Sequence, residues 1–231
     1  MWTSVLDHVN PRSTVLGALS TALILSLTCS MSMRYGHADV PIAETADLAQ
    51  PLAVGQVAPR FEVRTVENKP FVFDPRELER PVVLITFRGG WCPFCNMHLS
   101  ELKDVVSDID ALGVDVLFLS GDRPDLLYST LSRETQEDIA GLDYTILSDA
   151  DVQAAVALGV AFKASQRTID QRNKKGQDID DSSMLRHGVL PVPAVFAIGQ
   201  DGVVAFAYAN PDYKVRLPAD ELLAVIREIV Q

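Results

Sequence analysis

The feature that most constrains the fold is a pair of cysteines, Cys92 and Cys95, that directly follows an apolar run. The run, Val82–Phe87, is typical of a strand buried on both faces of a sheet. Beyond it, apolar residues recur at helical spacing until Gly113, which predicts a helix from about Cys92 to Leu112. A C-x-x-C between a buried strand and a helix is far more specific than the motif alone.

This placement predicts redox chemistry. At a helix N-terminus, free amide N–H groups and the helix dipole favour an anion, so we expect the pKa of Cys92 to fall from about 8.5 toward 7 or below. The two intervening residues let Cys95 reach back and close a small disulfide. We therefore predict Cys92 and Cys95 as the catalytic pair. Trp91 is expected to shield it, Arg88 to add positive potential, and the glycines at 89–90 to allow close approach.

Two other interpretations of the pair are a metal site and inert buried thiols. A structural zinc site needs four ligands, usually from a second C-x-x-C or a pair of histidines. The sequence has no second C-x-x-C; His98 lies three residues beyond Cys95 and His187 is remote. We therefore predict neither a metal nor another cofactor.

The rest of the chain alternates between apolar runs and helical patterns. Strands are expected at 61–66, 71–73, 114–119, 144–147, 194–198 and 203–208, and helices at 123–140, at 151–158 and from Pro218 onward. The polar stretch from Gln166 to His187 is expected to be an insertion, helical at its start and looped at its end. Together these predict an α/β domain with a central mixed sheet flanked by helices.

The first 38 residues differ from the rest. A weakly basic start, a short apolar run at 15–27 and small residues before Asp39 are the layout of a secretory signal peptide. This predicts export, in a bacterium to the periplasm, with residues 39–52 as a lead-in and 53–231 as a single domain. The alternatives are an uncleaved membrane anchor, lipid attachment at Cys29, or a cytoplasmic protein that starts at Met31 or Met33.

Charge and cysteine content narrow the function further. The net charge of −11 argues against nucleic acid or an anionic membrane surface as a partner. Cleavage before Asp39 removes Cys29, the third cysteine, and leaves one closely spaced pair. An exported protein with a single such pair suits a redox function.

These residues together resemble the thioredoxin-fold superfamily, and more closely the peroxiredoxin-like branch of the AhpC/TSA family. The segments 54–61, 147–149 and 196–203 look like that family's opening, middle and late hairpin. The resemblance implies a thiol-dependent antioxidant oxidoreductase that reduces hydroperoxides or protein disulfides. Its electrons would come from a thioredoxin-like or a membrane-relayed thiol donor. Pro193, directly before a predicted strand, resembles the cis proline that faces the disulfide in thioredoxin-like sites, although a proline there also marks an ordinary loop edge.

The chain departs from the peroxiredoxin pattern Pro-x-x-x-Thr-x-x-Cys. In an alignment on the last cysteine of the motif, Arg88 occupies the position of the proline, Cys92 that of the threonine and Cys95 that of the peroxidatic cysteine. Peroxiredoxins also orient the peroxide with an arginine far along the chain, and Pro193 occupies its position here. By comparison with thioredoxins Cys92 would be the nucleophile, and by comparison with peroxiredoxins it would be Cys95. Cys95 lies one helical turn further into the helix and is expected to be less accessible, which favours Cys92. Two rival functions stay open: a disulfide reductase or oxidase without peroxidase activity, and a non-catalytic binding module. The sequence leaves the oligomeric state open.

Overall fold

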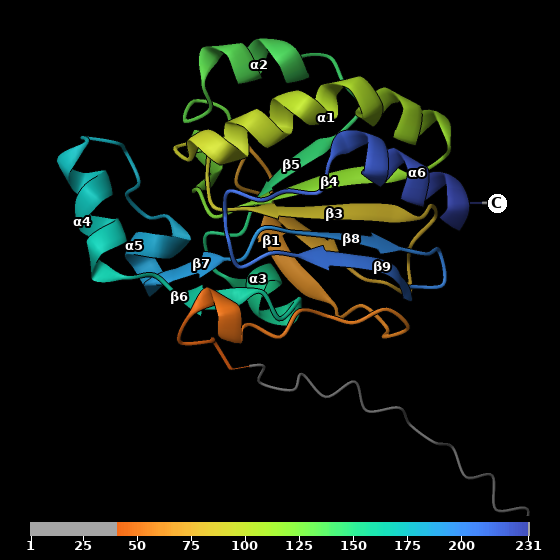
Figure 1. The fold of residues 1–231 in the computed structure, drawn as a ribbon, viewed down its shortest axis with the longest axis horizontal. Helices are drawn as coiled ribbons and strands as arrows, with labels where there is room; N and C mark the ends of the chain where they lie inside the picture. The colour runs from red at the N-terminus through yellow and green to blue at the C-terminus, as the bar shows by residue number, and fades with distance from the viewer. Residues whose placement is uncertain (1–40, 231) are drawn as a thin grey trace, which may run out of the picture. The chain divides into compact units, whose positions relative to one another are not determined.

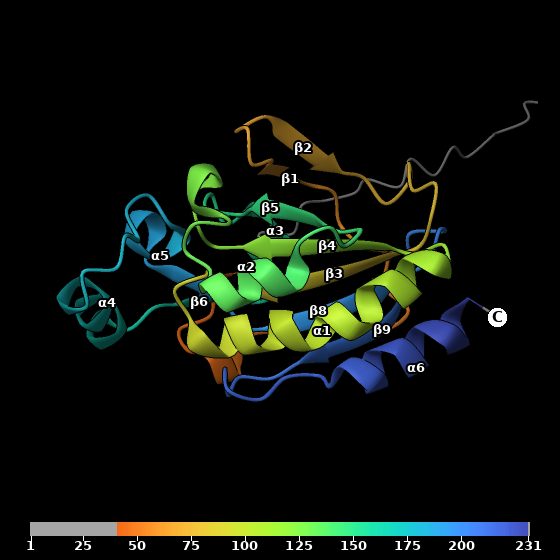
Figure 2. The ribbon, with the colours of Figure 1, turned by 90° about the horizontal axis from the view of Figure 1, so that it is seen from above.

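The computed structural model describes residues 41–230, so the expected signal or anchor segment at 1–38 lies outside the described part of the chain. Seven strands form one mixed sheet in the order β2-β1-β5-β4-β3-β8-β9 (Figure 2). Their bounds are β1 Phe61–Arg64, β2 Pro70–Phe73, β3 Val82–Phe87, β4 Asp115–Ser120, β5 Thr145–Ser148, β8 Ala194–Ile198 and β9 Val204–Ala209. The expected mixed sheet is confirmed.

Strand β3 is the centre of this sheet. It pairs in parallel with β4 and antiparallel with β8, and all of its residues are buried. Val83 and Ile85 belong to one hydrophobic core, whereas Leu84 belongs to the other. Because alternate side chains of a strand point to opposite faces, the apolar run supplies both cores at once.

Three helices cover one face of the sheet: α1 (Pro93–Ala111), α2 (Arg133–Ile139) and α6 (Ala219–Ile229) (Figure 1). Helix α3 (Gln153–Ala157) and the 3-10 turn η1 (Ala46–Leu48) lie on the other face. The expected helix after the cysteine loop is confirmed as α1. No helix in residues 41–230 is both long enough and apolar enough to span a membrane.

The helix expected at 123–140 is wrong in its first half. A 3-10 turn, η2 (Pro124–Leu126), is followed by a bend, and α2 begins only after Ser132. The Thr130 hydroxyl bonds the Leu126 carbonyl, and the Ser132 hydroxyl accepts the Thr135 N–H as an N-cap. These local bonds start a new helix instead of continuing one.

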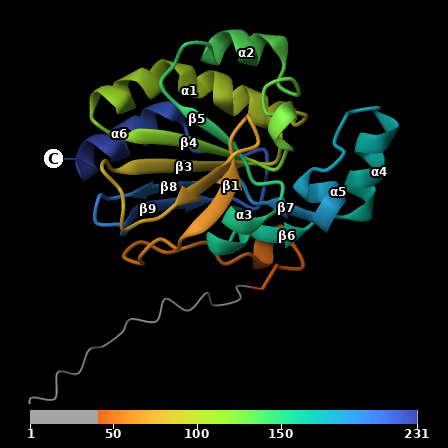
Figure 3. The same ribbon diagram turned by 180° about the vertical axis from the view of Figure 1, so that it is seen from behind.

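The insertion contains helix α4 (Gln166–Lys174), as expected, and a second helix, α5 (Ser183–His187), where we expected a loop (Figure 3). Ser182 caps α5 by accepting the Leu185 N–H. Two short strands that the sequence did not indicate, β6 (Ala161–Lys163) and β7 (Val189–Pro191), pair across the base of the insertion. Three residues are too few to show a periodicity.

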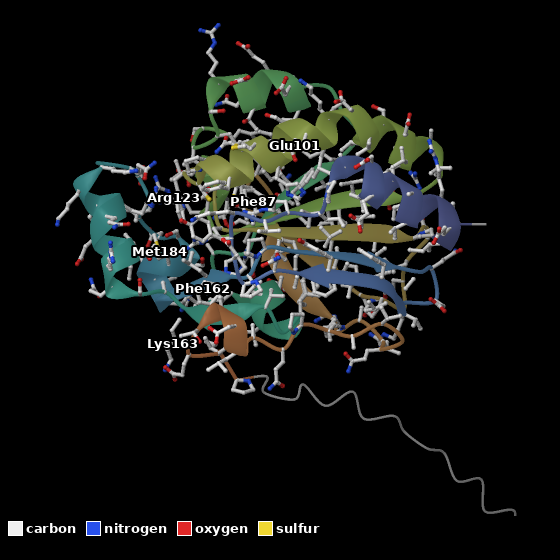
Figure 4. The ribbon with its side chains drawn as sticks, in the orientation of Figure 1. Phe87, Glu101, Arg123, Phe162, Lys163 and Met184 are labelled. Atoms are coloured by element: carbon white, nitrogen blue, oxygen red, sulfur yellow. The ribbon has the colours of Figure 1, made fainter. Side chains whose placement is uncertain are left out.

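The carboxyl ends of β3 and β4 lie at the end of the sheet beside α4 and α5. Figure 4 labels Phe87, the last residue of β3, and Arg123, which follows β4. Arg123 donates to both carboxylate oxygens of Asp178 at 2.9 Å and to the Asp180 carbonyl. The insertion is thereby tied to the end of the sheet at which the cysteine loop begins.

Candidate active site

Cys92 is the N-cap residue of α1, with Pro93 at the first helical position. Its backbone is extended, and its carbonyl accepts the N–H groups of Cys95 (3.0 Å) and Asn96 (3.1 Å). Pro93 suits this position because its missing N–H would have had no helical partner. The sulfur therefore lies at the positive end of the helix dipole, as the sequence predicted.

The two thiols are free and electrostatically unequal. Hydrogen bonds from the Cys95 thiol and then its backbone N–H, helped by Arg88 and Arg216, lower the pKa of Cys92 to about 6 against the effect of burial. Burial raises the pKa of Cys95 well above its ordinary value. The structure therefore favours Cys92 as the thiolate and Cys95 as its hydrogen-bond donor.

The expectation that Cys92 is the more accessible sulfur stays a prediction, because each cysteine residue is only 1% exposed. Trp91 is 4% exposed and Arg88 is 7% exposed. The Arg88 guanidinium lies 5.7 Å from the Trp91 ring centroid and 4.6 Å from that of Tyr213. These side chains enclose the dithiol, so protonation rather than exposure distinguishes the two cysteines.

The glycines of the cysteine loop are packed against other residues of the protein and leave no room for a Cβ atom. A Cβ on Gly89, whose φ is +144°, would lie 2.4 Å from Trp91 Nε1 and 2.6 Å from Asp122 Oδ1. A Cβ on Gly90 would lie 2.3 Å from Thr130 Oγ1. Glycine is therefore required at both positions for the loop to close over these neighbours.

Two side chains hold the loop in place. The Asp122 carboxylate accepts the Gly90 N–H at 2.7 Å, and the Asn96 amide donates to the carbonyls of Gly90 (2.6 Å) and Cys92 (3.0 Å). Burial raises the pKa of Asp122 to about 6 despite its hydrogen bonds to Gly90 and Thr130. The sequence did not single out either Asp122 or Asn96.

Pro193 lies at the expected end of the sheet, but its peptide bond is trans, as are all those in the described residues. Thr86 pairs with Ala194, which puts Pro193 level with the end of β3, from which the cysteine loop departs. The Thr86 hydroxyl donates to the Val192 carbonyl and accepts the Ala194 N–H, so it spans the proline on both sides. The cis form expected at Pro193 is therefore wrong, and the Thr86 hydroxyl ties the segment to β3.

His98, the residue weighed as a metal ligand, is buried and bonded elsewhere. Its Nε2 lies 3.2 Å from the Leu217 carbonyl oxygen, which can only accept, so the Nε2–H donates this hydrogen bond. Burial lowers the pKa of His98 to about 4. Within residues 41–230, no three His, Cys, Asp or Glu side chains are grouped so that they could hold a metal ion. His98 instead links α1 to the segment before α6.

Three groups that the sequence did not assign to the site lie against it. Arg216 Nη2 is 3.7 Å from Cys95 Sγ. Arg172, from α4, lies 4.7 Å from the Trp91 ring centroid, and Gln177 donates to the Trp91 carbonyl at 3.3 Å. The sequence indicated only a polar insertion at 166–187.

Comparisons with known proteins identify the family to which the chain belongs. The AhpC/TSA family profile matches residues 54–207. Peroxiredoxin Bcp of Escherichia coli strain K12 is 29% identical over 139 residues, which are 59% of this chain and 85% of that protein. The thiol-disulfide oxidoreductase ResA of Bacillus thuringiensis subsp. konkukian is 22% identical over 153 residues, which are 66% of this chain and 68% of that protein.

Solved structures show the same fold. A peroxiredoxin-like protein from Aquifex aeolicus superposes with a TM-score of 0.56 at 21% identity, covering 78% of this chain and 89% of the other. Peroxidoxin BcpB from Mycobacterium tuberculosis gives 0.52 at 20% identity, covering 77% and 98%. The chain therefore belongs to the AhpC/TSA family and has the thioredoxin-like fold of peroxiredoxins.

Proposed function

We propose that this protein is a peroxiredoxin-like thiol oxidoreductase that cycles Cys92 and Cys95 between dithiol and disulfide. The observation that carries the proposal is the electrostatic asymmetry of the pair: Cys92 at the N-cap of α1 accepts a hydrogen bond from Cys95, whose pKa is raised. A thiolate beside a protonated thiol is the arrangement needed for attack and resolution.

With a hydroperoxide, the Cys92 thiolate attacks the terminal oxygen and the O–O bond breaks. Cys92 becomes a sulfenic acid, and the departing alkoxide or hydroxide takes a proton. Cys95 then gives up its proton and attacks the Cys92 sulfur, which forms the disulfide and releases water. Two electrons from a thiol donor, thioredoxin-like or relayed across a membrane, restore the dithiol.

A second candidate is thiol-disulfide exchange without peroxidase activity. It is favoured by the departures from the peroxiredoxin pattern, because Cys92 and Pro193 stand where the peroxide-orienting threonine and arginine would be. The relatives include both a peroxiredoxin and a thiol-disulfide oxidoreductase. A non-catalytic binding module would instead have thiols that do not react. Export, proposed from residues 1–38, would make a membrane-relayed donor necessary.

The test is to mix the reduced protein with hydrogen peroxide and follow thiol loss and tryptophan fluorescence, alongside Cys92→Ser and Cys95→Ser. Oxidation much faster than that of a free thiol, with sulfenic acid forming at Cys92 in Cys95→Ser, would support the peroxidase. Slow oxidation with rapid exchange against a protein disulfide would establish the second candidate. Full activity in both variants would contradict the proposal.

A further inference from the structure

Three guanidinium groups lie near the dithiol or near the adjacent Trp91 ring. Arg88 is only 7% exposed, and its guanidinium lies 5.7 Å from the Trp91 ring centroid and 4.6 Å from that of Tyr213. Arg172 covers the Trp91 ring at 4.7 Å, and Arg216 lies 3.7 Å from Cys95 Sγ. Arg88 and Arg216 both interact electrostatically with Cys92 and Cys95. We call Arg88, Arg172 and Arg216 the arginine cluster.

The arginine cluster is not neutralised by the protein's own acids. None of its three members forms an ion pair with a carboxylate of residues 41–230, although the chain carries 31 Asp and Glu against 20 Lys and Arg. Arginines elsewhere do form such pairs: Arg60, Arg64, Arg76, Arg80, Arg123, Arg133, Arg186 and Arg227. Asp122, the buried acid of the cysteine loop, accepts from Gly90 and Thr130 and from no arginine of the cluster.

The arginine cluster also keeps unused hydrogen-bond donors. The Nε atoms of Arg88, Arg172 and Arg216 are buried, and none has a hydrogen-bond partner within the described residues. Unpaired buried donors are rare in native proteins and need an explanation. The single charge of a Cys92 thiolate offsets only one of three positive charges, and disulfide formation removes even that. Both facts point to an anionic group supplied by a ligand.

A groove reaches Arg216, one member of the arginine cluster. It has a volume of about 630 Å³ and runs between α1 and the segment before α6, with Phe94, Met97, His98, Lys214 and Arg216 among its lining residues. Its acids are Glu101 and Asp104, which lie on later turns of α1 than the cysteines, and Asp220 in the first turn of α6. Its cations, Lys214 and Arg216, lie on the segment before α6, and Arg216 Nη2 is 3.7 Å from Cys95 Sγ. The volume of the groove suits a small molecule.

We propose that this site selects small disulfides or hydroperoxides that carry a carboxylate close to the bond attacked by Cys92, and that the arginine cluster binds this carboxylate. The inference rests on the proposed function and adds the substrate class. Guanidinium groups bind carboxylates through paired, charge-assisted hydrogen bonds. A buried setting strengthens such contacts relative to water.

With a disulfide, the Cys92 thiolate forms a bond to one sulfur and the substrate S–S bond breaks, releasing one carboxylate-bearing thiolate. Cys95 then loses its proton and attacks Cys92, which releases the second thiolate and leaves the protein disulfide. The dithiol is oxidised by two electrons and the substrate disulfide is reduced by two. The proton passes to solvent or to a product thiolate.

The test compares three disulfides of similar size and different charge: 3,3′-dithiodipropionate (anionic), bis(2-hydroxyethyl) disulfide (neutral) and cystamine (cationic). The rate of thiol loss in the reduced full-length chain is divided by the rate of 2-mercaptoethanol with the same disulfide, which removes intrinsic differences in reactivity. We expect the anionic disulfide to exceed the neutral one by roughly tenfold or more at low salt, and the cationic one to be slowest. Added salt should shrink this preference.

Arg172→Gln and Arg216→Gln should each lower the ratio of anionic to neutral rates several-fold. A change in the pKa of Cys92 alters all three rates together, so this ratio reports binding of the anion. Arg167→Gln, an exposed neighbour on α4, is the matched control and should leave the ratio unchanged. Equal normalised rates, or a preference that survives both substitutions, would overturn the inference and leave the proposed function intact. Reaction with none of the disulfides nor with hydrogen peroxide would overturn the proposed function itself.

Discussion

Arg216 lies with its Nη2 atom 3.7 Å from the sulfur of Cys95, although 121 positions separate the two residues in the chain. The same arginine is anchored by donating to the backbone carbonyls of Tyr213 and Val215. A cation held in this way favours a thiolate on either sulfur, yet Cys95 stays protonated because its burial outweighs the attraction. The negative charge is thereby assigned to Cys92.

The pH dependence of thiol reactivity should follow from this assignment. In the reduced protein, the rate of alkylation by iodoacetamide should rise with a midpoint near pH 6, because hydrogen bonds from Cys95 lower the pKa of Cys92 to about 6. Cys95→Ala removes the side-chain donor and should move the midpoint upward by about one pH unit or more. Cys95→Ser keeps a donor and should move it less. Equal midpoints in both variants would show that the side-chain hydrogen bond is not the cause.

Stability should depend on the protonation of Asp122. Because burial raises its pKa from 3.8 to about 6, the folded state holds this proton more tightly than the unfolded state does. Its contribution is fully present below about pH 4 and is lost as the pH rises through 6, with a total of about 3 kcal/mol. The free energy of unfolding from urea titrations should fall across this window more in the wild type than in Asp122→Asn. Parallel pH profiles would contradict this.

Alanine at the loop glycines should destabilise the protein through steric conflict. Gly90→Ala tests the steric clash alone, because its Cβ would lie 2.3 Å from Thr130 Oγ1 and 2.7 Å from the Leu131 backbone nitrogen. Gly113→Ala tests conformation alone, since its φ is +78° and nothing lies within 4 Å. We expect a loss of about 1 kcal/mol for Gly113→Ala and at least about 2 kcal/mol for Gly90→Ala. Gly89→Ala combines both costs and should have the lowest urea midpoint.

The hydroxyl of Thr86 should matter more than its methyl group. Thr86→Val keeps the shape but loses the bonds to the Val192 carbonyl (2.9 Å) and the Ala194 N–H (3.0 Å). We expect a loss of about 2 kcal/mol in the free energy of unfolding, because both partners are buried. Thr86→Ser retains the hydroxyl and should lose less. A more stable Thr86→Val than Thr86→Ser would show that the hydroxyl does not hold the Pro193 segment.

The sequence by itself determined the central strand and the helix that presents the cysteines. Val82–Phe87 is buried throughout and apolar at every position except Thr86, and Pro93 starts α1 at the residue after Cys92. Both signals are local: strand burial and helix initiation depend on neighbouring residues and on a short repeat. For this reason the position of Cys92 at a helix N-terminus could be predicted without the fold.

The tertiary structure alone decided what surrounds the two sulfurs. Arg172 and Gln177 reach Trp91 from the insertion, and Arg216 reaches Cys95 from the segment before α6. The Thr86 hydroxyl bonds the backbone on both sides of Pro193. Burial and charge act through space, so the groups that set a thiol's pKa can come from any part of the chain. No local pattern marks those groups, because each is an ordinary polar residue until folding brings it to the dithiol.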